Sequence, residues 1–257
     1  MMHVVLDAPL PPLLTVRDVR KNFGNHEVLK GVTTSIGSHE VRAVIGPNGA
    51  GKTTFINVLT GIYAPSSGEV RLGGKDISSA APHRIVREGM ARTYQIASLY
   101  LSLTVAENIS VACHATSKFS KARSGDAMPL KERCDQMLEL FNLTPLAGRR
   151  VVEISHGDQR MVELAVTASL KPRLMLLDEP TAGMSPAETE QFIELINTRL
   201  RSNCAIMLVE HDMKVVMGTA DTITVLADGA VLAEGHPESI KRNAKVQEAY
   251  LGSAFAH

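Results

Sequence analysis

A nine-residue stretch, GPNGAGKTT (46–54), constrains the fold of this chain most strongly, because it fits the pattern G-x-x-x-x-G-K-[ST]. Consecutive backbone N–H groups can wrap around an anion only where side chains leave room, which accounts for the glycines. The loop also needs a strand before it and a helix after it. The mostly apolar run VRAVIG precedes it, and a helix is predicted to begin near Thr53. The sequence therefore predicts a strand–loop–helix unit that binds phosphate groups in an α/β fold.

The residue types of this loop match the groups of a nucleoside triphosphate. We expect Lys52 to reach the β and γ phosphates and the hydroxyl of Thr53 to bind Mg²⁺. The glycines expose the backbone between them to the phosphates. The predicted nucleotide-binding residues are Gly46, Pro47, Asn48, Gly49, Ala50, Gly51, Lys52, Thr53 and Thr54.

Two further apolar segments, LMLLDEP (174–180) and CAIMLVEH (204–211), end in acidic or histidine residues. Ligands bind at the carboxyl ends of strands in α/β sheets, so these side chains are expected beside the loop. We predict that Asp178 holds the Mg²⁺ shell and that Glu179 faces the water that attacks the γ phosphate. His211 is a candidate contact to the γ phosphate, although a lone histidine at a strand end is more often structural.

The segment ISHGDQR (154–160) lies about a hundred residues after the loop. Ser155 and Asp158 have the spacing of a capping box, so a helix is predicted to start here and to offer free N–H groups to an anion. Gly157 allows that backbone to come close. Loop 46–54 already serves the phosphates of one chain, so a second anion site predicts a nucleotide closed between two copies of the protein. A plain, well-capped helix is the alternative.

The rest of the chain divides into three predicted parts. Alternating segments from residue 13 to residue 45 predict a small antiparallel sheet, and residues from about 96 to 170 carry helical patterns. Within the latter, Thr104 and Glu107 have capping-box spacing, while the basic stretch TSKFSKARSGDAMP (116–129) predicts a solvated loop, or a contact with a partner or lipid head groups. Near the end, a hairpin turning at residues 228–229 precedes a helix predicted from Pro237 through Ala249.

Composition excludes several classes of protein. The 27 Lys and Arg residues balance the 27 Asp and Glu residues, which disfavours bulk nucleic-acid binding. Three distant cysteines suggest neither a disulfide framework nor a zinc site, and they predict buried thiols in a reducing compartment. The apolar start of the chain contains Asp7 and three prolines and fails as a secretory signal, and no run of about 18 apolar residues predicts a membrane span. A membrane role would therefore require a partner.

In order and spacing, these features resemble the ATP-binding cassette ATPases from about Thr15 onward. The resemblance rests on GPNGAGKTT, Gln95 after ARTY, the SHGDQ segment, LMLLDEP, the loop AGMSP (182–186) and His211. It implies an α/β P-loop NTPase fold, in which a RecA-like core carries an N-terminal antiparallel β-subdomain and an inserted α-helical subdomain. It further implies ATP as the nucleotide, Glu179, His211 and Gln95 as catalytic residues, and Gln95 as a further Mg²⁺ ligand. Phe23 lies where the family keeps the aromatic residue that stacks on adenine; an exposed strand aromatic is the alternative.

The family's segment LSGGQ reads ISHGDQR in this chain. An alignment without a gap retains Ser155 and Gly157 and puts Asp158 where the glutamine belongs. A gapped alignment would instead retain Gln159. We favour the ungapped alignment, in which Ser155 and Gly157 contact the nucleotide bound by a second subunit.

Several stretches resemble, more specifically, the ATPase subunits of bacterial importers for branched-chain amino acids. They are SLYLSLTVAENISVA, VEHDMKVVMGTADTITVLADGAVLAEGHPESI and VQEAYLG. The resemblance implies membrane permease subunits, a second ATPase subunit that is identical or different, an indirectly coupled substrate-binding protein, and a peripheral location on the cytoplasmic face of the bacterial inner membrane. Urea, amide and lipopolysaccharide transport are alternatives, as is a soluble cassette ATPase acting on nucleic acid or ribosomes. An ordinary P-loop GTPase or kinase would lack a role for the SHGDQ turn.

The predicted organisation is a single ATPase domain, residues 13–257, after a tail of residues 1–12. Residues 13–95 and 171–235 form the α/β core with its β-subdomain, residues 96–170 form the helical subdomain, and residues 236–257 form a C-terminal helical segment.

Overall fold

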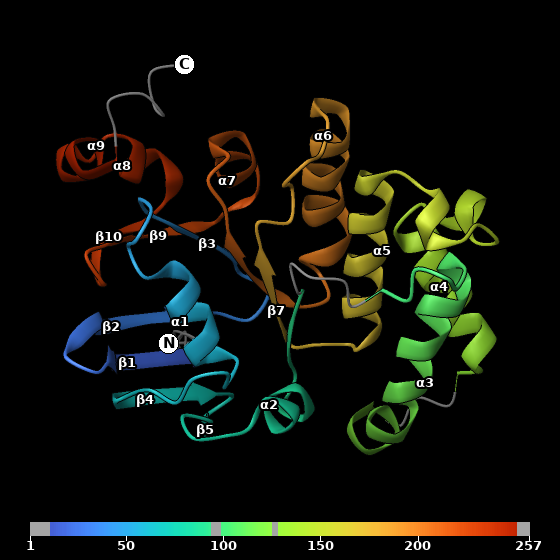
Figure 1. Ribbon diagram of the computed structural model, residues 1–257, viewed down its shortest axis with the longest axis horizontal. Coiled ribbons are helices and arrows are strands. Elements are labelled where there is room, and N and C mark those ends of the chain that lie inside the picture. Colours follow the sequence, from blue (N-terminus) through green and yellow to red (C-terminus); the bar gives the residue numbers. More distant parts are fainter. Residues whose placement is uncertain (1–10, 94–98, 125–127, 251–257) are drawn as a thin grey trace, which may run out of the picture.

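The structure, a computed structural model, describes residues 11–93, 99–124 and 128–250. It contains two β-sheets and a group of helices that lies to one side of them (Figure 1). In this view the four-stranded sheet and the helices α3 to α5 lie at opposite ends of the molecule, with the larger sheet between them.

The central sheet has six strands in the order β10-β9-β3-β8-β7-β6. Strands β6, β7, β8, β3 and β9 run parallel, and β10 is antiparallel to β9. All residues of β3, β7 and β8 are buried, which explains their mostly apolar sequences and confirms the predicted parallel strands. The bounds are β3 Val41–Ile45, β6 Met90–Arg92, β7 Leu174–Asp178, β8 Ala205–Val209, β9 Thr222–Ala227 and β10 Ala230–Gly235.

The second sheet is antiparallel, with the order β2-β1-β4-β5. Buried Leu14 and Val16 alternate on β1 with residues that are less buried, the period expected of a strand with one face on a core. The predicted antiparallel sheet is thus confirmed for the segments before residue 37, whereas EVRAVIG joins the other sheet. The bounds are β1 Leu14–Phe23, β2 His26–Ile36, β4 Ser67–Leu72 and β5 Lys75–Asp76.

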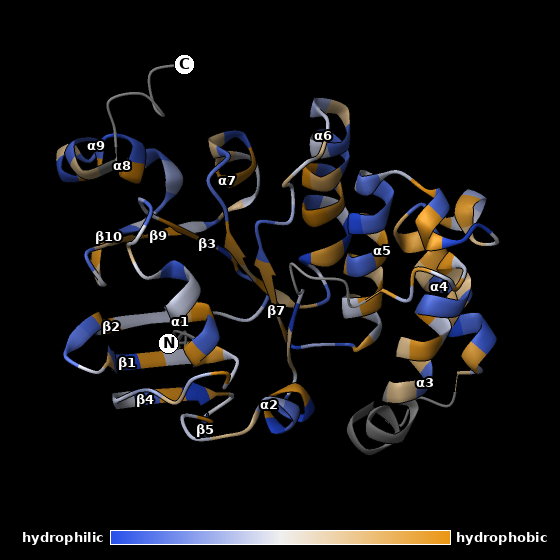
Figure 2. Cartoon of the chain, in the orientation of Figure 1, coloured by the Kyte–Doolittle hydropathy of each residue, from blue (hydrophilic) through white to orange (hydrophobic). Residues whose placement is uncertain are grey.

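Alternate residues of the central strands face two different cores. On β7, Leu174 and Leu176 pack with the four-stranded sheet and the helix after β3, whereas Met175 and Leu177 pack with the helical group. Strand β7 is accordingly coloured as largely hydrophobic in Figure 2. The central sheet therefore sits between the two halves of the molecule and fixes their relative position.

The helices cover both sides of this sheet. Helix α5 contacts both α3 and α4, and α3 begins with the predicted reciprocal capping box between Thr104 and Glu107. The bounds are α1 Lys52–Leu59, α2 Pro82–Glu88, α3 Val105–Ser124, α4 Leu130–Leu140, α5 His156–Ser169, α6 Pro186–Leu195 and α7 Met213–Thr219. Short 3₁₀ turns span Thr144–Leu146 and Val151–Glu153, and a π-helical turn spans Ile196–Leu200. Among the described helices, none is both long and apolar enough to span a membrane.

Two sequence predictions about helices are wrong. The basic stretch 116–129 is not wholly a loop, because α3 continues through Ser124; the long helix started at Thr104 outweighs the weak periodicity of its second half. The helix predicted from Pro237 through Ala249 is two helices, α8 Pro237–Lys241 and α9 Ala244–Tyr250. Asn243, whose side chain accepts hydrogen bonds from the backbone N–H groups of residues 245 and 246, separates them.

Candidate functional site

The register of the central sheet brings the predicted site together. Val44 on β3 pairs with Val209 on β8, and Val209 pairs in turn with Asp178 on β7. Since these strands are parallel, all three end at the same edge of the sheet. The glycine loop, the acidic pair Asp178 and Glu179, and His211 therefore lie next to one another at this edge, as predicted from the sequence.

The loop between β3 and α1 requires glycine at two points. A Cβ on Gly46 would lie 2.1 Å from the carbonyl oxygen of Leu226. Gly51, the N-cap of α1, has φ of 97°, in the left-handed region that favours glycine. No side chain caps α1, so the N–H groups of its first turn remain available to a ligand. The loop is thus an open helix N-terminus of the kind that binds phosphate.

Lys52 lies across this loop. Its Nζ donates to the carbonyl oxygens of Gly46 and Pro47, at 2.6 and 3.0 Å. Burial lowers the pKa of Lys52, and the charges of Glu179 and Asp178 oppose that shift. The ammonium group therefore stands between the loop backbone and the two acids, where it can exchange carbonyl partners for phosphate oxygens.

Asp178 is buried and forms an ion pair that the sequence does not reveal. Its Oδ2 accepts a hydrogen bond from Nη2 of Arg92 at 2.7 Å, and the two side chains are 5% and 9% exposed. Nη1 of the same guanidinium donates to Oδ1 of Asn57, on α1, also at 2.7 Å. We call Asn57, Arg92 and Asp178 the arginine clasp, because one guanidinium joins α1, β6 and β7.

Glu179 follows with its backbone in the left-handed region, at φ of 47°. A residue other than glycine, asparagine or aspartate rarely adopts this conformation, which often marks a functional site. The backbone N–H of Glu179 donates to the carbonyl of Val209 at 2.9 Å. Its Oε1 lies 3.9 Å from Nδ1 of His211, so the structure brings the predicted water-facing acid and the predicted histidine side by side.

Glu210, which was not singled out from the sequence, fixes the loops around these two residues. It is 1% exposed, and its carboxylate accepts hydrogen bonds from the backbone N–H and hydroxyl of Thr181 and from the backbone N–H groups of His211 and Asp212. A buried charge with four donors is well compensated. Glu210 therefore joins the loop after Glu179 to the end of β8.

The donor set at this edge fits a hard divalent cation. The hydroxyl of Thr53 and the carboxylate of Asp178 supply oxygen ligands of the type that Mg²⁺ prefers. Throughout the described residues, however, there is no group of three or more His, Cys, Asp or Glu side chains that could hold a metal ion. A bound Mg²⁺ would therefore take much of its coordination from phosphate oxygens and water.

Phe23 ends β1 with its side chain exposed, as a base-stacking residue requires. Its ring meets Tyr63 edge to face, with 5.2 Å between the centroids. Nζ of Lys21 lies 5.1 Å from the centroid of Phe23 and 5.5 Å from that of Tyr63. Tyr63 and Lys21 were missed at the sequence level, because only the fold brings residues 21–23 and 63 together.

The ISHGDQR segment starts α5, and Ser155 is its N-cap, as predicted. The Ser155 hydroxyl oxygen accepts from the backbone N–H of Asp158 at 3.0 Å, and the hydroxyl also donates to the Asp158 carboxylate at 2.8 Å. Gly157 is buried, and Oε1 of Glu188 lies 1.9 Å from where its Cβ would be. The carboxylate of Glu188, at the start of α6, thus covers the start of α5.

Hydrogen bonds from Ser185, first from its backbone N–H and then from its hydroxyl, lower the pKa of Glu188, and burial opposes this shift. Ser185 and Glu188 form a reciprocal capping box on α6. The N-termini of α5 and α6 therefore share one anionic side chain.

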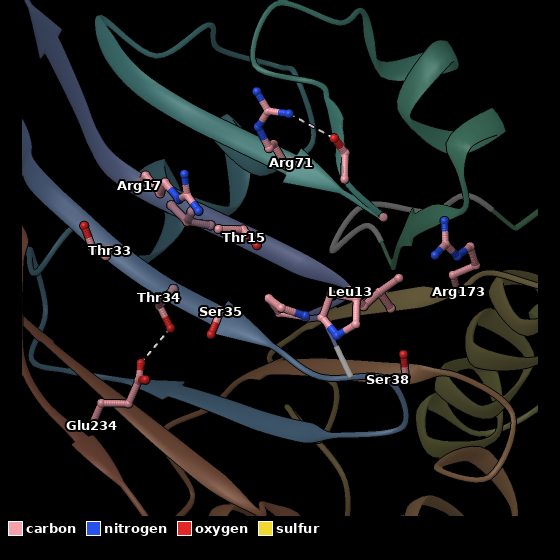
Figure 3. A pocket seen from close by; sticks show the side chains of 15 residues that line it. Leu13, Thr15, Arg17, Thr33, Thr34, Ser35, Ser38, Arg71, Arg173 and Glu234 are labelled. Carbon is pink, nitrogen blue, oxygen red and sulfur yellow. Dashed lines mark hydrogen bonds between the residues drawn. The ribbon is translucent and has the colours of Figure 1, made fainter. Parts of the chain in front are cut away.

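Gln95 lies outside the described residues, and its predicted role stays a prediction. A cavity of about 940 Å³ lies away from the glycine loop, on the outer face of the four-stranded sheet (Figure 3). Arg17, Arg71 and Arg173 are spread along it rather than directed at one point, and Thr34 and Glu234 are hydrogen-bonded at its edge. We assign this cavity no part in the site.

The chain is similar to known ATP-binding cassette transporter proteins. The sequence profile described as "ABC transporter" matches residues 29–182, and that described as "Branched-chain amino acid ATP-binding cassette transporter" matches residues 230–256. The chain is 40% identical over 253 residues to the high-affinity branched-chain amino acid transport ATP-binding protein BraF of Pseudomonas aeruginosa, covering 95% of this chain and 99% of that protein. It is 39% identical over 256 residues to the corresponding protein LivG of Escherichia coli K12, with the same coverage.

Solved structures show the same fold. The crystal structure of the ADP conformation of MJ1267, an ATP-binding cassette of an ABC transporter, matches with a TM-score of 0.82 and 28% identity, covering 95% of this chain and all of that one. A nucleotide-free ATP-binding cassette from an ABC transporter matches with a TM-score of 0.80 and 26% identity, with the same coverage.

Proposed function

Because this chain belongs to the ATP-binding cassette transporter family, we propose that it powers the import of branched-chain or related amino acids by binding and hydrolysing ATP with Mg²⁺. The observation that carries the proposal is the common sheet edge at which the glycine loop, Asp178, Glu179 and His211 meet. The branched-chain profile at residues 230–256 and the two transport relatives support this cargo over urea, amide or lipopolysaccharide.

The side chains divide the chemistry among them. The loop N–H groups and Lys52 bind the phosphates, and the exposed ring of Phe23 stacks on the base, with Tyr63 bracing it at the edge. Glu179 orients the attacking water, and His211, 3.9 Å away, contacts the γ phosphate. Thr53 and Asp178 would hold Mg²⁺, which would neutralise part of the negative charge of the phosphates. Gln95 is proposed as a further ligand and contact to this centre.

The working form is a pair of ATPase subunits. Ser155 and Gly157 of one subunit face the triphosphate held by the glycine loop of the other, so two nucleotides are enclosed per dimer. Loss of the γ phosphate removes the contact that both subunits share, and the pair opens. The second subunit is a copy of this chain or a related one.

The partners follow from this arrangement. The subunits bind membrane permease subunits, and through them they are coupled to a substrate-binding protein. This places the chain peripherally at the cytoplasmic face of a bacterial inner membrane. A cassette acting on nucleic acid or ribosomes is the competing function, and co-purification separates the two: tagged protein should retain hydrophobic permease subunits in detergent, and recovery with nucleic acid instead would reject transport.

The Glu179→Gln variant tests the catalytic assignment. The amide preserves size and cannot accept a proton from water, so turnover should fall at least about 100-fold while ATP binding persists. The closed pair should accumulate, which light scattering measures as an ATP-dependent doubling of mass. His211→Ala serves as a comparison that should lose turnover through the γ-phosphate contact. Undiminished hydrolysis by Glu179→Gln would refute the role given to that residue.

A further inference from the structure

The arginine clasp places a permanent positive charge beside the carboxylate of Asp178, which is the proposed Mg²⁺ ligand. We propose that Arg92 is a positioning residue that acts as the counter-ion of Asp178 when no nucleotide is bound, and that it makes divalent-metal binding at Asp178 depend on the phosphates of ATP. The inference rests on the proposed function. It concerns a residue outside the glycine loop and outside the acidic pair.

The geometry of the clasp is specific to a guanidinium. Nη2 of Arg92 contacts Oδ2 of Asp178, and Nη1 contacts Oδ1 of Asn57, each at 2.7 Å. The planar fork with several N–H donors spans both partners at once, which a lysine ammonium does not do as well. Among the described residues, the other carboxylate oxygen, Oδ1 of Asp178, accepts no hydrogen bond.

Sheet register explains why Arg92 reaches this position. Arg92 on β6 pairs with Leu176 on β7, and Asp178 lies two residues further along the same strand. Residues i and i+2 lie on one face of a strand, so Arg92 reaches Asp178 diagonally. Both side chains are nearly buried, at 9% and 5% exposed, where charge interactions are screened far less than in water.

Charge then determines metal affinity. A divalent ion approaching Asp178 meets a carboxylate that a cation already neutralises, and it is repelled by the guanidinium itself. Without nucleotide, the described part of the chain offers no cluster of three metal-binding side chains to offset this repulsion. Phosphate oxygens add the negative charge and the ligands that the protein lacks, so the metal binds Asp178 only together with ATP.

The test is a titration of Mn²⁺ against purified protein, followed by the electron paramagnetic resonance signal of free Mn²⁺, with and without ATP. Arg92→Gln removes the charge but keeps a hydrogen-bond donor to Asp178. We expect it to raise Mn²⁺ affinity without nucleotide by about 10-fold or more. Arg92→Lys keeps the charge and should stay within about 3-fold of the wild type. Adding Asp178→Asn to Arg92→Gln should abolish the gain.

A second variant guards against a failure of Arg92→Gln to fold. Asn57→Asp gives the same guanidinium a second carboxylate at a partly exposed position, and it should also raise nucleotide-free Mn²⁺ affinity. Wild-type affinity in folded Arg92→Gln and Asn57→Asp, or an equal gain in Arg92→Lys, would overturn the proposal. Failure of wild-type protein to bind Mn²⁺ even with ATP would instead reject the metal site of the proposed function, so the two failures are distinguishable.

Discussion

The helices α1 and α5 both begin at a predicted anion site, but their first turns differ. The N-cap of α1 is Gly51, and no side chain caps that helix. The N-cap of α5 is Ser155, whose hydroxyl binds Asp158, and Glu188 covers Gly157 in the same first turn. One helix N-terminus is open, and the other already has a hydroxyl cap and a carboxylate of its own chain beside it.

The difference indicates when each site works. An open N-terminus can bind phosphate in a single chain, and we expect the glycine loop to do so. The Glu188 carboxylate lies at the start of α5, where an anion would bind, and its negative charge offsets the partial positive charge of that helix end. We therefore expect α5 to contribute little to nucleotide affinity in a monomer and to act only once a second subunit brings its own triphosphate.

The largest expected difference is in nucleotide affinity. Lys52→Ala removes the cation of the open site, and ATP affinity of the monomer should fall by roughly 100-fold, since a hydrogen bond to a charged group is worth about 1.5–3 kcal/mol. Isothermal titration calorimetry measures this loss. Lys75→Ala, an exposed lysine paired with Glu88, is the control and should change little. Equal losses in Lys52→Ala and Ser155→Ala would contradict the division of roles between the two helices.

Gly157→Ala tests the contact between α5 and Glu188. The added Cβ would collide with the Glu188 carboxylate, the end of a flexible side chain that must then leave its hydrogen bonds, and we expect unfolding free energy to fall by about 1 kcal/mol. Thermal or urea unfolding measures the loss.

Two variants control this test. Gly148→Ala is matched to it, because a Cβ there meets no heavy atom within 4 Å. In a Glu188→Ala background, Gly157→Ala should cost much less, as expected for residues in contact. Additive losses would show that the collision is not with Glu188.

Ser155→Ala removes the side-chain cap of α5. We expect a loss of about 1 kcal/mol in unfolding free energy, the usual effect of losing an N-cap hydroxyl. The affinity of the monomer for ATP should remain within about 3-fold of the wild type, because we expect α5 to contribute little to nucleotide binding before a second subunit is present. A Ser155→Thr variant should retain most of the stability. Unchanged stability in Ser155→Ala would indicate that Glu188 alone satisfies this helix start.

The smallest effect concerns pH. The pKa of Glu188 is lowered in the folded chain, so its stabilisation is fully present above the unfolded value of about 4.3 and is lost as pH falls through the folded value. The difference in unfolding free energy between wild type and Glu188→Gln should be a few tenths of a kcal/mol at pH 7, because solvent screens the group, and it should shrink below about pH 4. A difference that grows with acidification would contradict this sign.

Sequence alone predicts the features that depend on local pattern. The buried strands before the glycine loop and before the acidic pair were predicted from their apolar runs, and the N-cap at Ser155 from its spacing to Asp158. The hairpin at Asp228 and Gly229 followed from the residue types of its turn, and both have positive φ.

What the sequence does not predict depends on contacts between distant segments. Arg92 is separated from Asp178 by 86 residues, and Glu188 from Gly157 by 31, so no local spacing indicates either pair. The continuation of α3 through Ser124 was missed for another reason: cooperative extension of a long helix outweighs weak periodicity in its second half. Helix ends and long-range charge pairs are where tertiary context decides.

Glu210 links two loops of the site, so a movement of one loop is passed to the other. Its carboxylate holds Thr181 on one side and the backbone of His211 and Asp212 on the other. If a neighbouring subunit displaces the 181–186 loop, we expect His211, the proposed contact to the terminal phosphate, to be pulled in the same direction. Assembly of the pair and alignment of this histidine become one movement, so a chain without a neighbour is expected to be a slow hydrolase even when it is saturated with nucleotide.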